Sequence, residues 1–378
     1  MRKTLILIIA GMLILSAASG FTASPPQEKV PVIIGFKDKQ DSDLIKGHDG
    51  EIKREYTLIN AIAAKLPEKM IEKLKKNPKI AYIEPDYIAQ TLQETTPWGV
   101  GKINANKVWQ APTSNKGTGI KVAILDTGIQ YNHPDLINNL KGGVYFAGWP
   151  DGSTNSWYWT DRHGHGTHVA GTVAAVDNDI GVIGVAPEAY LYAVKVLGDS
   201  GSGSYSDVIQ GIQWSVNTGK QVISMSLGGS GHSQALKDAV DNARARGVIV
   251  VAAAGNSGDG NPSTNNVLYP AKYDSVIAVA ATDSNDAVAS WSSDGSEVDV
   301  SAPGVSVYST YKGSGYATMS GTSMATPHVT GTVALMLKAG IRPSDVQSKL
   351  QSTSVDLLPG GFDVFSGHGR IDALKAVQ

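Results

Sequence analysis

Apolar residues gather in short, nearly continuous runs that are separated by longer stretches of mixed character. Four runs of this kind lie at residues 120–125, 191–196, 222–227 and 248–253. A run of this length without polar alternation predicts a β-strand that is buried on both faces. Apolar positions recur at helical spacing in residues 204–216 and 234–246, between these strands. Strands that alternate with helices predict an α/β domain, in which a parallel sheet is covered by helices on both faces.

The start of the chain predicts a secretory signal peptide over residues 1–23. Met1, Arg2 and Lys3 stand ahead of an apolar stretch at residues 5–15, and small residues follow as far as Gly20. The apolar stretch is too short to span a bilayer as a helix. Because no other segment is apolar enough to cross a membrane, we expect a secreted protein whose mature form is soluble.

A change in composition divides the rest of the chain. Residues 24–92 carry 12 Lys/Arg, 11 Asp/Glu and 3 Gly, so about a third of them are charged. Residues 93–378 carry 18 Lys/Arg, 23 Asp/Glu and 37 Gly, and about a seventh of them are charged. We therefore expect two domains. The first has β-like runs at 30–36 and 80–83 and a helical pattern at 67–77, which together predict a small α+β fold.

Composition excludes two further features. The chain has no cysteine, so disulfide bonds are excluded even though a secreted protein would permit them. A net charge of −2 argues against nucleic acid as a partner, because nucleic-acid binding relies on an excess of basic charge. The stability of the larger domain therefore has to come from its core or from a bound group.

Three polar segments carry candidate chemistry. In the run KVAILDTG, Asp126 lies at the carboxyl end of a predicted strand, where catalytic groups collect in open α/β sheets. The run HGHGTHVAGT places His165 just before a helical stretch of small residues. The run GTSMATPH places Ser323 at the start of an apolar helix, whose free N–H groups favour an oxyanion. A serine needs a base to remove its proton, and the base needs a carboxylate to hold its tautomer, so these residues predict a Ser-His-Asp triad.

Other interpretations of the same residues stay open at this point. Ser323 could be an ordinary helix cap. His163, His165 and His168 lie beside Asp161 and could bind zinc in a metallohydrolase, although the intervening glycines and the lack of an HExxH motif weaken that case. An aspartic protease would need a second DTG, which the chain does not contain. A catalytically silent binding module is a further alternative, because a fold does not determine a function.

Together, DTG, HGTHVAGT and GTSMATPH resemble the motifs of the subtilisin-type serine proteases, the subtilase family, and the resemblance covers nearly the whole chain. It implies that Asp126 orients the base, that His165 is the general base and that Ser323 is the nucleophile. It also implies that Asn256, in the run AAAGN, donates its side-chain amide to the oxyanion, beside the N–H of Ser323. We therefore expect a serine endopeptidase that acts as a monomer on protein or peptide substrates.

The first domain resembles the propeptide of the same family, which implies a chaperone and inhibitor for the enzyme that follows it. Matching the mature start through Pro97, Trp98 and Gly99 places self-cleavage between Leu92 and Gln93. A first substrate that ends in Leu92 predicts a main pocket for a medium-sized apolar side chain. Because one methylene in such a pocket changes the discrimination by only about 1 to 3 kcal/mol, the expected specificity is broad.

The resemblance further implies a substrate cleft whose edges bind an extended peptide through backbone hydrogen bonds. The implied substrate-binding residues are Gly201, Ser202, Gly203, Tyr205, Val208, Ser226, Leu227, Gly228, Ala253 and Gly255. Leu268 departs from the family, which usually has a small residue at the base of the main pocket. We therefore expect a shallower pocket that disfavours large aromatic side chains.

The loop VDNDIGV resembles the calcium-binding loop of the family. The implied ligands are the side chains of Glu94, Asp135 and Asn178 and the carbonyl groups of Val176, Ile180 and Val182. Hard oxygen ligands on a flexible loop suit Ca²⁺, and a bound ion would stabilise a fold that has no disulfides. Glu94 stands where the family has a glutamine, which adds a negative charge. An acidic surface turn is the alternative interpretation.

Residues 149–161 form a longer connection than the family usually has, and they contain Trp149, Trp157 and Trp159. These aromatic side chains could line the rim of the cleft or pack against the domain. The sequence assigns them no role.

Overall fold

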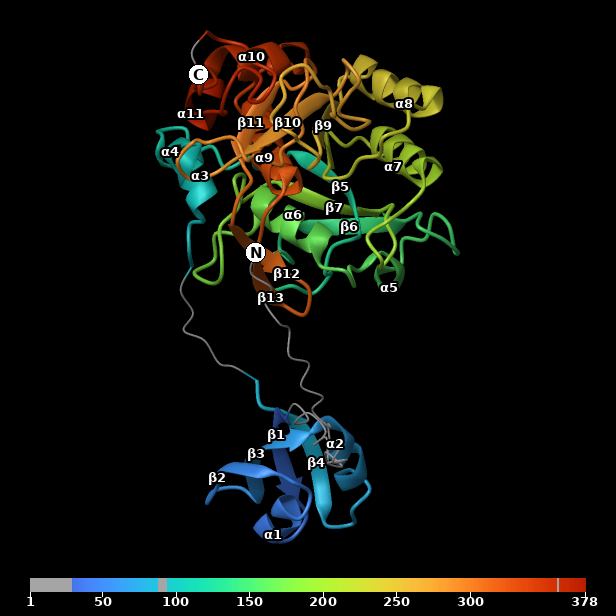
Figure 1. Cartoon of the computed structure of the whole chain (residues 1–378), viewed down its shortest axis with the longest axis vertical. Helices are drawn as coiled ribbons and strands as arrows, with labels where there is room; N and C mark the ends of the chain where they lie inside the picture. Colours follow the sequence, from blue (N-terminus) through green and yellow to red (C-terminus); the bar gives the residue numbers. More distant parts are fainter. Residues whose placement is uncertain (1–28, 88–93, 359) are drawn as a thin grey trace, which may run out of the picture. The chain divides into compact units, whose positions relative to one another are not determined.

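A computed structural model describes residues 29–87, 94–358 and 360–378 of the chain (Figure 1). The chain divides into two units, with the boundary between Thr91 and Leu92. The predicted signal peptide at residues 1–23 and the predicted cut between Leu92 and Gln93 lie outside the described residues. Both stay predictions, as do the exact limits of the two expected domains.

The smaller unit is an antiparallel sheet with two short helices, in agreement with the predicted α+β fold. Its strands run in the order β2 (Glu51–Glu55), β3 (Ala61–Pro67), β1 (Lys29–Phe36), β4 (Ile80–Pro85), and its helices are α1 (Ser42–Lys46) and α2 (Glu68–Leu74). Ile34, Ile62 and Leu66 are fully buried in its core. The sequence predicted β1, β4 and α2 but not β2, β3 or α1. In β2, all but one of the residues are exposed, and its charged side chains hide any apolar alternation.

The larger unit is built on seven parallel strands, which confirms the predicted fold class. The strand order is β11 (Val300–Pro303), β10 (Ile277–Thr282), β9 (Ile249–Ala253), β8 (Val222–Met225), β5 (Lys121–Asp126), β7 (Tyr190–Lys195), β6 (Leu140–Tyr145). The four predicted strands are β5, β7, β8 and β9, at the centre of this order. β6, β10 and β11 were not predicted.

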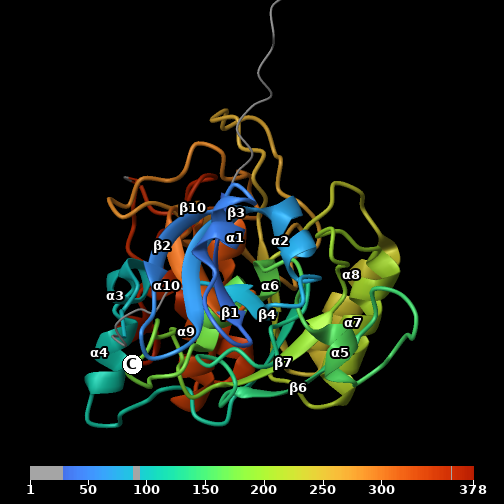
Figure 2. The same cartoon turned by 90° about the horizontal axis from the view of Figure 1, so that it is seen from below.

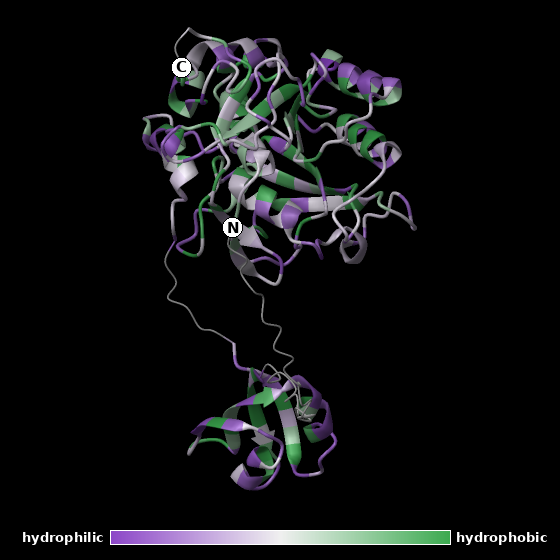
Figure 3. Ribbon diagram, in the orientation of Figure 1, coloured by the Kyte–Doolittle hydropathy of each residue, from purple (hydrophilic) through white to green (hydrophobic). Residues whose placement is uncertain are grey.

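Alternate side chains of each central strand enter two different cores. In β5, Val122 and Ile124 belong to one core, whereas Ala123 and Leu125 belong to the other. The first core is completed by α6 (His165–Ala174) and α9 (Thr322–Lys338), and the second by α7 (Tyr205–Asn217) and α8 (Gln234–Ala245). α7 and α8 lie side by side in two views (Figure 1 and Figure 2). Colouring by hydropathy shows hydrophobic strands between helices of alternating character (Figure 3).

The remaining elements lie around this frame. They are α3 (Trp98–Lys102), α4 (Ala105–Gln110), α5 (Ser156–Trp159), the short 3₁₀-helix η1 (Pro343–Asp345), α10 (Val346–Thr353), α11 (Ala373–Ala376) and the hairpin of β12 (Val307–Tyr311) and β13 (Gly315–Met319). Within the described ranges, no helix is long and apolar enough to cross a membrane.

Helix caps explain why two helices begin where the sequence predicts. Ser204 and Asp207 form a capping box at the start of α7, in which the Ser204 side chain accepts from the Asp207 N–H and the Asp207 carboxylate accepts from the Ser204 N–H. The Ser233 hydroxyl accepts from the Leu236 N–H at the start of α8. Because these caps satisfy N–H groups that a helix start leaves free, each helix begins at the residue that follows its cap.

We predict that Gly331→Ala destabilises the larger unit, although glycine-to-alanine changes inside helices usually stabilise them by about 1 kcal/mol. A Cβ at this position in α9 would lie 2.5 Å from the Val185 Cβ, which forces the core apart. We expect the free energy of unfolding to fall by about 1 to 3 kcal/mol. Tryptophan fluorescence during denaturant unfolding measures this, because all seven tryptophans follow residue 93.

Gly101→Ala in α3 is the matched control, since a Cβ there meets no atom within 4 Å. Its midpoint should stay unchanged or rise. Equal effects of the two substitutions would contradict the packing argument.

Candidate active site

Asp126 is the last residue of β5 and is completely buried. By strand alternation its side chain points to the face of the sheet that α6 and α9 cover. Its Oδ1 accepts hydrogen bonds from the Thr127 N–H at 2.7 Å and from His165 Nδ1 at 2.7 Å. A buried carboxylate oxygen needs such donors to replace its hydration, and here the local backbone and the imidazole supply them.

His165 is the first residue of α6, and a glycine with a left-handed backbone, Gly164 at φ 109°, turns the chain into the helix. Because Nδ1 donates to Asp126, the network assigns Nε2 as the free acceptor of the neutral ring. Burial of the ring opposes its charged form, but the negative charge of Asp126 and their hydrogen bond outweigh burial, so the pKa of His165 is raised. The ring is 17% exposed, which leaves Nε2 accessible.

Asp161 joins the loop before α6 to the turn after β5, a role that the sequence did not indicate. Its Oδ1 accepts from the Thr127 hydroxyl at 3.0 Å and from the N–H groups of His163 and Gly164 at 2.9 and 2.8 Å. Its Oδ2 accepts from the N–H and hydroxyl of Thr167 at 2.9 and 2.7 Å. The Asp161 side chain thereby holds the start of α6 in register with the carboxylate of the candidate triad.

The three histidines do not converge on one point, as a zinc site would require. His168 is buried, and its Nε2 lies 3.0 Å from the Val307 carbonyl oxygen and 3.1 Å from that of Ala317. Burial lowers the pKa of His168 to about 4, so its ring is neutral. The rings of His163 and His165 are 6.3 Å apart between centroids. No group of three or more His, Cys, Asp or Glu side chains in the part of the chain described here could hold a metal ion.

Ser323 is the second residue of α9 and is half-buried among small neighbours. The helix cap is Gly321, without a side-chain bond, so the interpretation of Ser323 as a cap is wrong. Pro327 has no N–H to offer the Ser323 carbonyl four residues earlier. The Ser226 hydroxyl donates to that carbonyl instead, at 2.8 Å, while the Ser323 hydroxyl donates to the Ser226 carbonyl at 3.1 Å. These two hydrogen bonds join the start of α9 to Ser226, the residue that directly follows β8.

The hydroxyl of Ser323 and the ring of His165 are not hydrogen-bonded to each other in the described ranges, since the hydroxyl points to Ser226. A serine hydroxyl turns about a single bond, and catalytic hydrogen bonds often form fully only when substrate is bound. Of the two contacts expected in the triad, the hydrogen bond between Asp126 and His165 is therefore present, and the one between His165 and Ser323 is not.

Two nitrogen donors lie beside the space next to Gly321 that a Cβ would occupy. Asn256 accepts at Oδ1 from the N–H and the hydroxyl of Thr322, at 2.9 and 3.0 Å, which leaves its amide nitrogen free to donate. A Cβ built on Gly321 would lie 3.5 Å from the Asn256 Nδ2 and 3.6 Å from the Ser323 N. Because the first N–H groups of a helix have no partner within it, this space suits an oxyanion.

A cleft of ≈ 360 Å³ runs beside His165. Its lining residues are Thr127, His163, His165, Leu197, Ser200, Gly201, Ser202, Gly203, Tyr205, Val208, Ser226, Leu227 and Gly228. Of the expected substrate-binding residues, only Ala253 and Gly255 do not line it. The sequence did not assign Thr127, His163, Leu197 or Ser200 to the cleft. Thr127 and His163 lie within two of the singled-out runs, and Leu197 and Ser200 each adjoin a singled-out segment.

Leu268 fills a narrow slot between two glycines of the predicted main pocket. A Cβ at Gly228 would lie 2.8 Å from the Leu268 Cβ, and a Cβ at Gly255 would lie 2.8 Å from the Leu268 Cγ. The expected base of the main pocket is therefore occupied by a leucine side chain, which explains why Gly255 does not line an open cleft.

The loop at residues 176–182 meets the two acidic side chains expected to bind calcium. Glu94 Oε1 accepts from the Asn178 N–H at 2.9 Å, and Asp135 Oδ2 accepts from the Val182 N–H at 2.9 Å. The N–H of Val176 donates to the Asp135 carbonyl at 2.9 Å, and that of Ile180 to the Asn178 side chain at 3.2 Å. All six expected ligand residues therefore lie on segments that are in contact.

Lys116 pairs with Asp177 of this loop at 2.7 Å, but no ion pair of the described residues joins Asp135 or Glu94. Asp135 Oδ1 is buried and has no hydrogen-bond partner among the described residues, and burial raises the pKa of Asp135 to about 6. Burial and the neighbouring Asp177 also raise the pKa of Glu94. An orphaned carboxylate oxygen beside a second acid fits a hard cation with oxygen ligands.

Comparison with known sequences identifies both units. The subtilase family model matches residues 117–369, and the peptidase inhibitor I9 model matches residues 33–92. Subtilisin E from Bacillus subtilis (strain 168) is 45% identical over 357 residues, which cover 92% of this chain and 90% of that protein. An alkaline protease from Alkalihalobacillus alcalophilus is 42% identical and covers 100% of both chains. Subtilisin DY from Bacillus licheniformis is 52% identical over 75% of this chain and all of its own length.

These matches confirm the resemblance drawn from the three motifs and give no support to a metallohydrolase. They cover the same two units into which the structure divides. The chain belongs to the subtilase family of serine endopeptidases and carries an inhibitor I9 propeptide domain ahead of the protease domain.

Proposed function

We propose that this subtilase is a secreted endopeptidase in which Ser323 is the nucleophile, His165 the general base and Asp126 the orienting carboxylate. The hydrogen bond of 2.7 Å between His165 Nδ1 and Asp126 Oδ1 carries this proposal. It supports the tautomer in which Nε2 is free to accept a proton. The raised pKa of His165 suits a base that becomes positively charged during the reaction.

The attack begins when the Ser323 hydroxyl turns from the Ser226 carbonyl to His165 Nε2. His165 takes the proton while the serine oxygen bonds to the carbonyl carbon, and Asp126 stabilises the imidazolium. The carbonyl oxygen becomes an oxyanion that accepts from the Asn256 amide and the Ser323 N–H. His165 then gives its proton to the leaving amine, and water repeats the sequence to release the acid. One such side-chain donor contributes about 2.7 to 4 kcal/mol, a figure measured on subtilisin itself.

The cleft supports binding of an extended peptide between the edges at Gly201–Gly203 and Ser226–Gly228, which offer backbone groups to any sequence. The same cleft would process the chain between Leu92 and Gln93 and then bind the propeptide as an inhibitor. The expected substrates are proteins and peptides, and the expected state is a monomer. Neither the signal peptide nor the cut falls within the described residues.

We predict that Ser323→Ala lowers kcat by about 10⁶, the loss measured for the nucleophile of subtilisin. The variant should also stay an uncut precursor, because the same hydroxyl performs the maturation. Peptide hydrolysis, N-terminal sequencing and labelling with a fluorophosphonate measure these outcomes. Ser320→Ala, which changes an exposed serine of the same segment, is the control and should keep both labelling and maturation. A Ser323→Ala chain that begins at Gln93 would contradict the proposal.

We predict that Leu268→Gly opens the main pocket to large side chains, because the leucine fills the slot between Gly228 and Gly255. For peptides with phenylalanine before the cut, kcat/KM should rise about tenfold relative to peptides with alanine there. Leu358→Gly removes an exposed leucine and should leave this ratio as it is. An unchanged ratio in Leu268→Gly would show that this residue does not limit the pocket.

We further propose a structural Ca²⁺ site formed by the side chains of Glu94, Asp135 and Asn178 and by carbonyl groups of the loop. The unpartnered Oδ1 of Asp135 supports it, because a cation satisfies a buried carboxylate oxygen that accepts no hydrogen bond. The ion would bind only the folded chain and would therefore stabilise it by mass action. Its carbonyl ligands would be those of Val176, Ile180 and Val182.

Removal of calcium with EGTA should lower the melting temperature and speed self-digestion. Asp135→Asn should lower the melting temperature by itself and abolish the response to EGTA. Asp259→Asn changes an exposed acid elsewhere and should keep the full response. A melting curve of the parent chain that EGTA does not move would reject the site.

A further inference from the structure

Lys195 is a fully buried lysine beside the candidate triad, with 2% of its side chain exposed. It ends β7, where it is the register partner of Asp126 at the end of β5, and strand alternation places both side chains on the same face. A buried ammonium loses its hydration, and an apolar side chain of similar length would often serve stability as well. Its charge at this position therefore calls for a functional explanation.

The two partners of Lys195 connect the triad to the substrate cleft. Lys195 Nζ donates to the Thr127 carbonyl at 2.6 Å, in the turn that directly follows Asp126. It also forms an ion pair of 2.9 Å with Asp199 Oδ1. Asp199 lies in a turn closed by the hydrogen bond from the Gly198 N–H to the Ser202 carbonyl, at 2.8 Å. That turn leads directly into the cleft edge, so one ammonium group is bound to both parts of the site.

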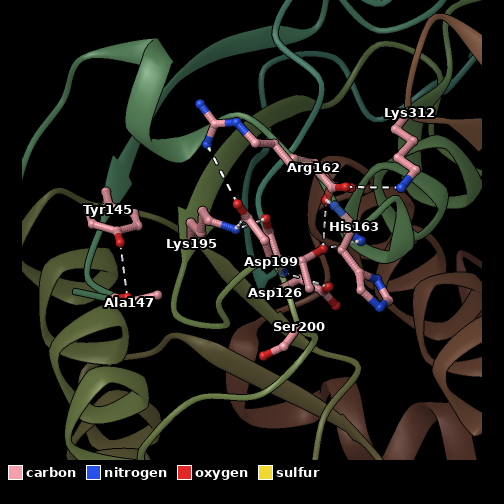
Figure 4. Close-up of polar contacts among 12 residues, drawn as sticks. Asp126, Tyr145, Ala147, Arg162, His163, Lys195, Asp199, Ser200 and Lys312 are labelled. Atoms are coloured by element: carbon pink, nitrogen blue, oxygen red, sulfur yellow. Dashed lines mark hydrogen bonds and ion pairs between the residues drawn. The ribbon is translucent and has the colours of Figure 1, made fainter. Parts of the chain in front are cut away.

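The outer side of Asp199 faces the aromatic segment for which the sequence gave no role. Arg162 approaches Asp199 Oδ2 at 4.0 Å, and Figure 4 shows Lys195 and Arg162 on two sides of the same carboxylate. Trp157 holds Arg162 in place, since its carbonyl accepts from Arg162 Nη2 at 2.7 Å and its ring lies 4.9 Å below the guanidinium. This exposed ion pair is long and weak, so Lys195, at 2.9 Å, is the main partner of Asp199.

We infer that Lys195 is a positioning residue, which acts through Thr127 on the carboxylate of the triad and through Asp199 on the substrate-binding edge. The inference rests on the proposed serine mechanism and adds a coupling between the triad and the substrate-binding edge. When Asp199 moves with the cleft edge, Lys195 transmits the movement to the turn that holds Asp126.

We expect the charges of this pair to act on His165 as well, because Lys195 is the register partner of Asp126, which binds the ring. Asp126 on β5 and Asp161 on the loop before α6 raise the pKa of His165. Further charged or titratable groups on the neighbouring segments are Arg162 and His163 on the same loop, His168 on α6, Lys195 on β7, Asp199 on the following turn and Lys312 after β12. From the signs of the charges, we expect Lys195 to disfavour the imidazolium and Asp199 to favour it. Removal of either partner alone therefore leaves the other uncompensated, with opposite effects on the pKa of His165.

The test compares Lys195→Met with Asp199→Asn in the full chain, after maturation, with active enzyme counted by fluorophosphonate titration. In Lys195→Met, kcat should fall about 10- to 100-fold, because the turn after Asp126 loses its anchor. The acid limb of the pH profile of kcat/KM should move up by roughly half a unit, because a positive charge near the imidazolium is gone. In Asp199→Asn the same limb should move down, and KM should rise more than kcat falls.

Controls separate positioning from a merely structural role. The double variant should return the acid limb toward its parental position, because it removes both charges. Lys312→Met removes an exposed lysine from the same neighbourhood and should leave the profile in place, since solvent screens that charge.

Shifts of the acid limb in the same direction, or a parental kcat in Lys195→Met, would overturn the inference. Asp199 is half exposed, so Asp199→Asn should fold even if Lys195→Met folds poorly. It then still tests whether the charge of this pair shifts the acid limb. Failure of the serine mechanism itself would look different, because the parent enzyme would then take up no fluorophosphonate.

Discussion

The hydrogen bond between Asp126 and His165 depends on a carboxylate that is buried at the carboxyl end of a parallel strand. A buried charge is tolerated only where donors replace its hydration, and removal of one partner from such a pair typically costs about 3 to 5 kcal/mol. Asp126 receives one donor from its own turn and one from the first residue of α6. The surrounding structure serves to keep these two donors in place.

Parallel topology makes this arrangement possible. The carboxyl ends of all seven strands lie at one edge of the sheet, and helices that return over one face begin near that edge. α6 and α9 both cover the face to which Asp126 points, so their first residues bring His165 and Ser323 toward it. Segments separated by nearly two hundred residues thus meet without any disulfide, through backbone pairing and core packing alone.

The central strands could be predicted because burial on both faces produces uninterrupted apolar runs, as in β5 and β9. β6 could not, because it lies at the edge of the sheet and its sequence LKGGVY mixes a lysine with two glycines. β11 escaped prediction for another reason: its four residues, VSAP, are fewer than a pattern needs to show a period. The pattern of apolar and polar residues thus predicts which strands are buried, but it does not predict which segments pair as edge strands.

The same distinction holds for the site. Asp126, His165 and Ser323 stand in short local motifs that a sequence displays directly. The residues that hold these side chains in place do not stand in such motifs. For example, the hydrogen bond from the Ser226 hydroxyl to the Ser323 carbonyl, which Pro327 leaves without its helical donor, joins positions about a hundred residues apart. A lone aspartate or lysine in the sequence is most often a surface residue, so the buried positions of Asp161 and Lys195 carry no local signal.

Buried polar side chains are concentrated around the candidate active site. Asp126, Asp161, Thr167 and Lys195 are all buried around the carboxyl edge of the sheet, whereas the bodies of β5, β9 and β10 are almost wholly apolar. Each buried polar group adds little net stability even when its hydrogen bonds are complete. The apolar strands have to supply the free energy of folding that this polar layer does not. The sheet therefore has apolar strands that stabilise the fold and a polar carboxyl edge that holds the site. This division follows from the requirement that the Asp126 carboxylate and the His165 imidazole stay in contact in a largely buried position.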